Sequence, residues 1–95
     1  MTGRESVRKH KAGQRNFSKV KLRRADLEGA DLRDANLSWA YLKGANLIGA
    51  NLRDANLSNA DLRWTNLYDT DVTSAQLAQA KSLRGTTLPD GGRHE

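Results

Sequence analysis

Hydrophobic and polar positions recur along this chain with a period of five residues. From Ala25 to Leu67 the sequence divides into units ADLEG, ADLRD, ANLSW, AYLKG, ANLIG, ANLRD, ANLSN, ADLRW and TNL, each opening with a small residue and carrying a Leu two places later. On an α-helix, successive Leu residues would be rotated by about 140° and would form no buried stripe. A flat strand fails as well, because side chains alternate with period 2 and a spacing of five sends neighbouring Leu residues to opposite faces.

A chain that turns one corner per unit satisfies the pattern. The small residue and the Leu then point inward, the residue between them points outward, and the last two residues form an outward corner. The residues that end the units agree with this, because Gly, Asp and Asn tolerate a positive φ or form side-chain-to-backbone turn bonds. These residues are Gly29, Asp34, Gly44, Gly49, Asp54, Asn59 and Asp69. No Pro occurs before Pro89, so no ladder between coils loses an N–H.

The motif A(D/N)LXX resembles that of the pentapeptide repeat family, over thirteen units from about Arg15 to Gln79. The resemblance implies an all-β fold, a right-handed quadrilateral parallel β-helix with four units in each coil. On this basis the chain makes about three coils. The periodicity alone does not distinguish four sides from three.

Changes in the pattern divide the chain into four segments. Residues 1–14 have no apolar periodicity and are expected to form a disordered basic arm. The β-helix is expected over residues 15–73, with Phe17 closing the first coil. Residues 74–88 are expected to cap the last coil, and residues 89–95 to form a flexible tail.

The cap is predicted from a helix signal and a last apolar position. Thr73, Ser74, Ala75 and Gln76 form a capping-box pattern, which predicts a short helix from about Ser74 to Lys81. Leu88 is expected to be the last inward residue, with order ending at Pro89.

The net charge of +5 is unevenly distributed. Residues 1–24 hold nine Lys or Arg against one acidic residue, whereas residues 25–95 hold seven against ten. The arm contributes Arg4, Arg8, Lys9 and Lys11. Such an arm is able to hold a nucleic acid, an anionic surface or an acidic protein. The alternative is a solubilising tail without a partner.

Stacking positions twenty residues apart sorts the outward side chains into columns. One column is basic and has aromatic neighbours, the composition typical of binding hot spots. The candidate partner-binding residues are Arg23, Trp39, Tyr41, Lys43, Arg63 and Trp64. The alternative is that Trp64 lies over Gly44 and Arg24 as a cation–π brace. Ile48 and Tyr68 form an outward apolar pair that is either a self-association surface or an isolated exposed pair.

The residues of catalytic and metal sites are absent or scattered. The chain has no Cys, and no Gly-rich phosphate loop or metalloprotease motif occurs. His10 and His94 lie in the two terminal segments. Asp31 and Asp71 stack on Asn51, but solvated turn residues are the simpler interpretation. The sequence therefore predicts no enzyme, no cofactor and no metal. It has no apolar signal segment or spanning run, which favours the cytoplasm.

Three functional hypotheses follow. The first is a non-catalytic protein-binding or scaffold module, in which a rigid β-helix presents the basic, aromatic face to a protein partner or an assembly; a homodimer is compatible with it. The second is drawn from the family resemblance, which includes quinolone-resistance proteins that mimic DNA on topoisomerases with an acidic surface. Residues 15–79 hold nine basic and eight acidic residues, which departs from that pattern. The third is binding of nucleic acid or another anionic surface through the arm.

Overall fold

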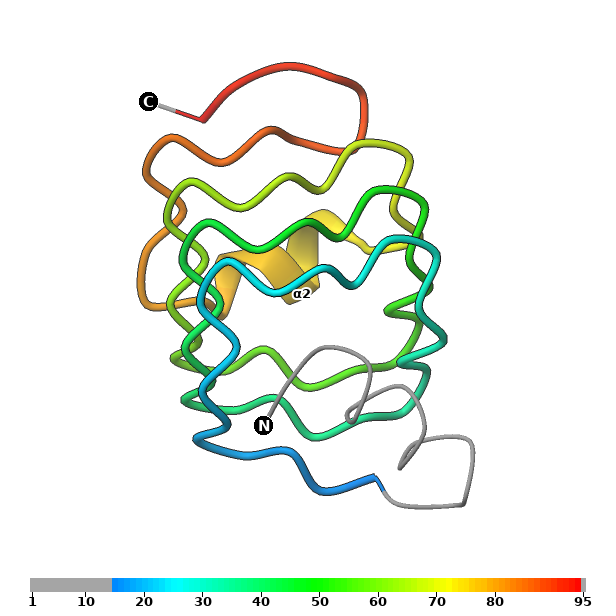
Figure 1. Ribbon diagram of the computed structural model, residues 1–95, viewed down its shortest axis with the longest axis vertical. Helices are drawn as coiled ribbons and strands as arrows, with labels where there is room; N and C mark the ends of the chain where they lie inside the picture. The colour runs from blue at the N-terminus through cyan, green and yellow to red at the C-terminus, as the bar shows by residue number, and fades with distance from the viewer. Residues whose placement is uncertain (1–14, 95) are drawn as a thin grey trace.

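The computed structural model describes residues 15–94, whose backbone forms a coil that repeats every twenty residues (Figure 1). Four columns of parallel β-bridges join successive coils. They are Asn16–Asn36–Asn56, Lys21–Tyr41–Asp61, Asp26–Asn46–Asn66 and Asp31–Asn51–Asp71. Every bridge in these residues is isolated, and no longer strand forms. Four columns in each twenty-residue coil make the solenoid four-sided.

The interior of the solenoid is a stack of Leu side chains lined by Ala. The Leu residues from Leu22 to Leu67 are at most 2% exposed, and Phe17 takes the equivalent position in the first coil, also at 2%. Burial of each Leu contributes about 1.5–3 kcal/mol. Thr65 and Thr70 replace Ala at the small inward position, and their buried hydroxyls donate to carbonyls of the preceding coil at 2.8 Å. The inward positions are therefore those that the sequence predicts.

Each corner is a four-residue turn with one residue in the left-handed region. The N–H of the small residue donates to the carbonyl of the Leu three places earlier, for example Ala45 to Leu42 at 2.9 Å. The residue just before the small one has φ between 57° and 73° in every unit up to residue 69, including all the Gly, Asp and Asn corners expected from the sequence. Four longer side chains also adopt this conformation, namely Lys19, Arg24, Trp39 and Trp64.

The Asp or Asn at the second position of each unit supports the turn that follows it. In nine units its Oδ1 accepts a hydrogen bond from the N–H two residues later, at 2.9–3.3 Å. This local bond explains the motif, because it satisfies a turn N–H that no ladder reaches. Lys21 and Tyr41 hold the same position and cannot accept such a bond.

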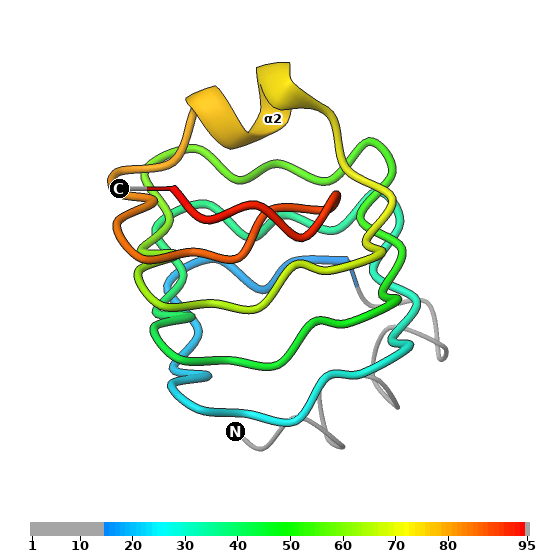
Figure 2. The same ribbon diagram turned by 90° about the horizontal axis from the view of Figure 1, so that it is seen from above.

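Helix α2, residues Ser74–Ala78, takes the place of the next bridge above Asn56. The predicted capping box is present: Gln76 N–H donates to Thr73 Oγ1 at 3.1 Å, and Thr73 N–H donates to Gln76 Oε1 at 2.9 Å. The Gln76 amide also donates to two carbonyls of the coil below, those of Leu52 and Ala55. Figure 2 shows α2 across the end of the stack, away from the cyan segment of the first coil.

The helix is shorter than the sequence predicts, and the coil resumes after it with a changed register. Lys81 N–H donates to the Ala60 carbonyl at 2.9 Å, so the chain must leave the helix to rejoin the ladder. The next bridges join Asp61 to Ser82 and Asn66 to Thr87, a spacing of twenty-one residues. The helical detour therefore uses one residue more than a regular unit.

The expectation of a flexible tail from Pro89 is wrong for the described residues. Asp69 N–H donates to the Pro89 carbonyl at 3.0 Å, which extends the ladder through the proline. The chain then reverses and returns beside itself, with an antiparallel bridge between Thr87 and Arg93 (orange and red in Figure 1). His94 N–H donates to the Thr86 carbonyl at 2.9 Å. A proline keeps its carbonyl acceptor, so losing the N–H does not prevent this pairing.

Candidate interaction face

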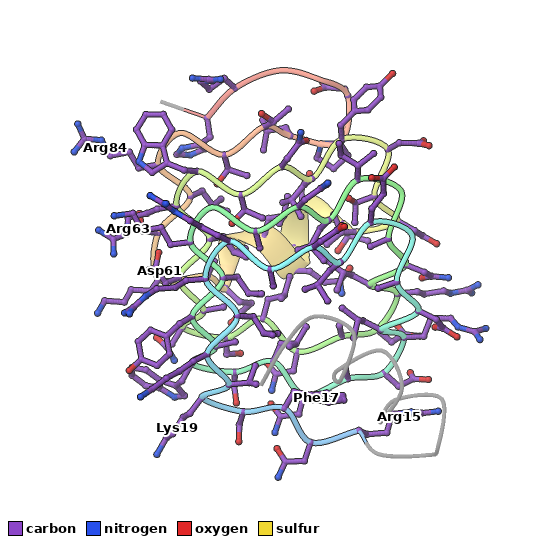
Figure 3. All side chains as sticks on the ribbon, viewed as in Figure 1. Arg15, Phe17, Lys19, Asp61, Arg63 and Arg84 are labelled. Carbon is purple, nitrogen blue, oxygen red and sulfur yellow. The ribbon has the colours of Figure 1, made fainter. Side chains whose placement is uncertain are left out.

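The cations of the described residues gather on one side of the solenoid. We call the basic face the column of Lys21, Tyr41, Asp61 and Ser82 together with the two corners that border it. The cations on or against this face are Lys19, Lys21, Arg23, Arg24, Lys43, Arg63, Lys81, Arg84 and Arg93. They are nine of the twelve Lys and Arg in residues 15–94. Among residues 15–94 this face carries a single carboxylate, whereas the other sides carry eight. Figure 3 shows Lys19, Arg63 and Arg84 along this side, with Phe17 on the adjoining one.

The same face carries the residues that the fold itself disfavours. Lys21 and Tyr41 hold second positions without the acceptor that supports the turn, and both belong to this column. Trp39 and Trp64 adopt φ of 60° and 59° at its two corners, where a side chain other than Gly, Asn or Asp costs about 1–2 kcal/mol. Both Trp side chains nevertheless remain 52% exposed. The turn geometry of the repeat therefore does not favour these four residues, and all four lie on the basic face.

The one carboxylate of the face is neutralised by its neighbour. Arg63 donates to both oxygens of Asp61, from Nε at 2.9 Å and from a terminal nitrogen at 2.7 Å. These bonds lower the pKa of Asp61, with the charges of Arg63 and Lys43 adding to the effect and partial burial opposing it. The pKa of Arg63 is raised by the same contact. Asp61 therefore stays ionised and holds the Arg63 guanidinium in place.

Two aromatic rings of the face, those of Tyr41 and Trp64, lie against cations. The Arg23 guanidinium lies 5.0 Å from the centre of the Tyr41 ring, and that of Arg93 lies 5.8 Å from the Trp64 ring. A Cβ built on Gly85 would stand 2.4 Å from Trp64, so this ring lies directly against the glycine backbone. The alternative interpretation, in which Trp64 lies over Gly44 and Arg24 as a brace, is therefore wrong, because the ring packs on Gly85 of the next coil.

Arg24 covers Gly44 instead, with its Cγ 3.2 Å from the position of a Cβ there.

Two adjoining cavities open on the basic face and share Arg63 and Trp64. The first, of about 450 Å³, is lined by Arg23, Arg24, Lys43, Gly44, Arg63 and Trp64. The second, of about 550 Å³, is lined by Asp61, Arg63, Trp64, Lys81, Ser82 and Arg84. The first has four cations and no carboxylate in its walls. The two cavities therefore lie side by side at this corner, and the cations in their walls favour an anionic ligand.

The structure brings together most of the residues that the sequence nominates. Arg23, Lys43, Arg63 and Trp64 line the first cavity, Tyr41 lies under Arg23, and Trp39 occupies the opposite corner of the face. Sequence reasoning missed Lys81, Arg84 and Arg93. The sequence places residues 74–88 in the cap and residues 89–95 in a tail, so its columns of outward residues end before these three cations. In the structure the coil resumes after α2 with Ser82 bridged to Asp61, and the tail folds back on the coil.

The other candidate residues from the sequence lie away from the basic face or outside the described part of the chain. Tyr68 is 52% exposed, and its ring lies 3.7 Å from the position of a Cβ on Gly91. The structure holds one copy of the chain, so self-association through Ile48 and Tyr68 stays a prediction. Asp31 and Asp71 do stack on Asn51, and the described residues contain no group of three or more potential metal ligands. The arm residues Arg4, Arg8, Lys9 and Lys11 lie outside the described part of the chain, as does His10.

His94 was expected in the tail. It is instead held by backbone bonds to Thr86 and Gly85, and it lines a separate cavity beside α2.

Comparison with known proteins decides the family. A model of pentapeptide repeats matches the chain at residues 16–47, 35–73 and 45–81. The chain belongs to the pentapeptide repeat family. Its fold is accordingly a right-handed β-helical solenoid, and members of the family are generally non-catalytic. A comparison with curated protein sequences gives no match.

Solved structures of pentapeptide repeat proteins agree with this assignment. A protein from the thylakoid lumen of Arabidopsis thaliana is 35% identical with a TM-score of 0.60, over 78% of this chain and 47% of that one. A Nostoc protein is 34% identical with a TM-score of 0.50, over 92% and 75%. HetL, a Nostoc protein involved in heterocyst differentiation regulation, is 37% identical with a TM-score of 0.51, over 83% and 43%. The chain thus spans about half the length of two of these pentapeptide repeat proteins. No helix in its described residues is long and apolar enough to cross a bilayer.

Proposed function

We propose that this pentapeptide repeat protein is a non-catalytic binding module whose basic face contacts an acidic segment of a protein partner or assembly. One observation carries the proposal. Residues that the fold disfavours, Lys21, Tyr41, Trp39 and Trp64, are confined to the face that also collects nine cations. Aromatic residues and Arg are the types most enriched where binding energy concentrates.

The dimensions of the face favour a short protein segment. Four coils spaced at about 4.8 Å make the face only about 14 Å high along the stack. An extended peptide of four or five residues covers that length at about 3.3 Å per residue. One turn of duplex DNA needs about 34 Å. A protein segment therefore matches the described surface better than a duplex does.

The direct test begins by identifying the partner. The tagged protein is recovered from its native cell after cross-linking, and the affinity of the identified partner is then measured with two charge-reversed variants. Arg23→Glu with Lys43→Glu alters the basic face, while Arg33→Glu with Arg53→Glu makes the same charge change at the equivalent unit positions of another side. We expect the first pair to weaken binding at least about tenfold, a loss of 1.4 kcal/mol, and the second to have little effect. Equal effects of the two pairs would refute the face assignment.

A second candidate rests on the other sides of the solenoid. Within residues 15–94 these sides carry eight carboxylates against Arg15, Arg33 and Arg53. An acidic surface is what DNA mimicry on a topoisomerase requires, and a gyrase supercoiling assay tests it. Inhibition by the parent protein that is lost when Asp34 and Asp54 are replaced by Asn would favour this function over the first.

Binding of nucleic acid through residues 1–14 is tested separately. Affinity that falls steeply with salt and is lost on deleting the arm would support it.

A further inference from the structure

We propose that the first cavity of the basic face is a phosphoryl site, and that the group it receives is a phosphorylated side chain on the partner segment. This inference rests on the proposed function and specifies the chemistry of the partner. The site consists of Arg23, Arg24, Lys43 and Arg63 around Gly44, with Trp64 as one wall.

Three of the four cations of this cavity lack a carboxylate partner within the described part of the chain. Arg63 is paired with Asp61, but Arg23, Arg24 and Lys43 form no ion pair with a carboxylate of residues 15–94. Like charges held around one hollow repel each other, and an anion placed between them removes that repulsion. The cavity therefore favours a ligand that carries more than one negative charge.

The positions of these cations are set by the fold. Arg24 is directed over Gly44, where the absence of a Cβ leaves room for its stem. Asp61 orients Arg63 by a two-point contact, and Arg23 rests on the Tyr41 ring. Side chains held in this way lose less rotamer freedom when a ligand binds. The cavity is thus partly organised before any anion arrives.

A phosphomonoester matches the cavity better than a carboxylate does. It carries about −1.5 to −2 charge at pH 7 and three strong acceptor oxygens. Guanidinium groups, which make up three of the four cations here, bind phosphate through two parallel hydrogen bonds. A single carboxylate would leave most of the positive charge unmatched.

A single-stranded nucleic acid fits less well. Such ligands stack successive bases on several exposed rings along a charged groove. On this corner of the face only Trp64 lines the cavities, and Tyr41 is already stacked with Arg23. The second cavity adds Lys81 and Arg84 next to the first, enough for neighbouring acidic residues of a peptide.

The test uses three fluorescent heptapeptides that differ only at the central residue of a Gly/Ser sequence, which is phosphoserine, Glu or Ser. A labelled oligothymidine serves as the nucleic-acid probe. Binding is followed by anisotropy, and the Gly44 amide and Trp64 indole signals are followed by NMR. We expect the phosphoserine peptide to bind at least about tenfold more tightly than the Glu peptide, and to shift both signals.

Two substitutions locate the site. Arg24→Gln with Lys43→Gln should abolish the preference for phosphoserine, and Arg33→Gln with Arg53→Gln, of equal charge change, should preserve it. Equal affinity for the phosphoserine and Glu peptides would overturn the inference, as would tighter binding of oligothymidine or equal losses in both variant pairs.

Failure of this inference is distinguishable from failure of the proposed function. If phosphatase treatment of the native partner leaves binding unchanged while Arg23→Glu with Lys43→Glu still abolishes it, the phosphoryl site is refuted and the binding face remains. If the charge reversals have no effect either, both are refuted.

Discussion

Replacing Gly85 by Ala tests the packing that forms the wall between the two cavities. The new Cβ would meet three atoms of the Trp64 ring at 2.4–2.6 Å, and the backbone there has φ of +72°. Ala in the left-handed region costs about 1 kcal/mol. Forcing the rigid ring aside adds about 1–3 kcal/mol, typical of an overpacked contact. We expect the free energy of unfolding to fall by about 2–4 kcal/mol.

Gly49→Ala supplies the matched control. Gly49 has φ of +68° and nothing within 4 Å of its Cβ position, so this variant is destabilised only by the strained backbone conformation. Chemical denaturation of both variants isolates the contact with Trp64 as the difference. Adding Trp64→Ala to Gly85→Ala removes the clash with the ring. The double-mutant cycle should therefore give a coupling energy of about 1–3 kcal/mol. If Gly85→Ala and Gly49→Ala are equally destabilised, Trp64 does not pack on Gly85 and the shared wall is refuted.

Three further predictions concern the core, the corners and the acid limit of stability. Leu47→Asp places an unpaired charge at a position that is 0% exposed and should abolish the cooperative thermal transition; a melt close to that of the parent would contradict the core assignment. Trp39→Asn, which copies Asn59 at the same corner, should raise the free energy of unfolding by about 1 kcal/mol, whereas a loss of stability would show that the fold needs this ring. The pKa of Asp61 is lowered by Arg63, so its stabilising contribution is present above the unfolded value of about 3.9 and is lost as the pH falls through the folded value. Between pH 7 and pH 2 the free energy of unfolding should therefore fall less in Asp61→Asn than in the parent. An equal fall in both proteins would refute the stabilising contact between Asp61 and Arg63.

The interior of this protein was readable from the sequence because its causes are local. A Leu at every fifth position is compatible with neither a helix nor a flat strand, and Gly, Asp or Asn at the corners has the conformational freedom that a positive φ needs. The capping box was also readable, since both of its bonds lie within Thr73–Gln76. The four-sided geometry required the family resemblance, because spacing along one chain does not count sides.

Tertiary structure decided how the C-terminal end of the solenoid closes and how far the basic face extends. The end of α2 depends on Lys81 meeting the ladder at Ala60, and the order beyond Pro89 depends on bonds to Asp69 and Thr86. No local pattern encodes these partners.

For the same reason the sequence nominated Arg23, Lys43 and Arg63 but not Arg84. The first three lie in regular units of the repeat, while Arg84 lies in the segment that the sequence assigned to the cap, where the coil resumes after α2. The repeat determined which side chains point outward. The packing of the last coil determined which of them share a cavity, because contacts between distant residues depend on how the whole stack closes.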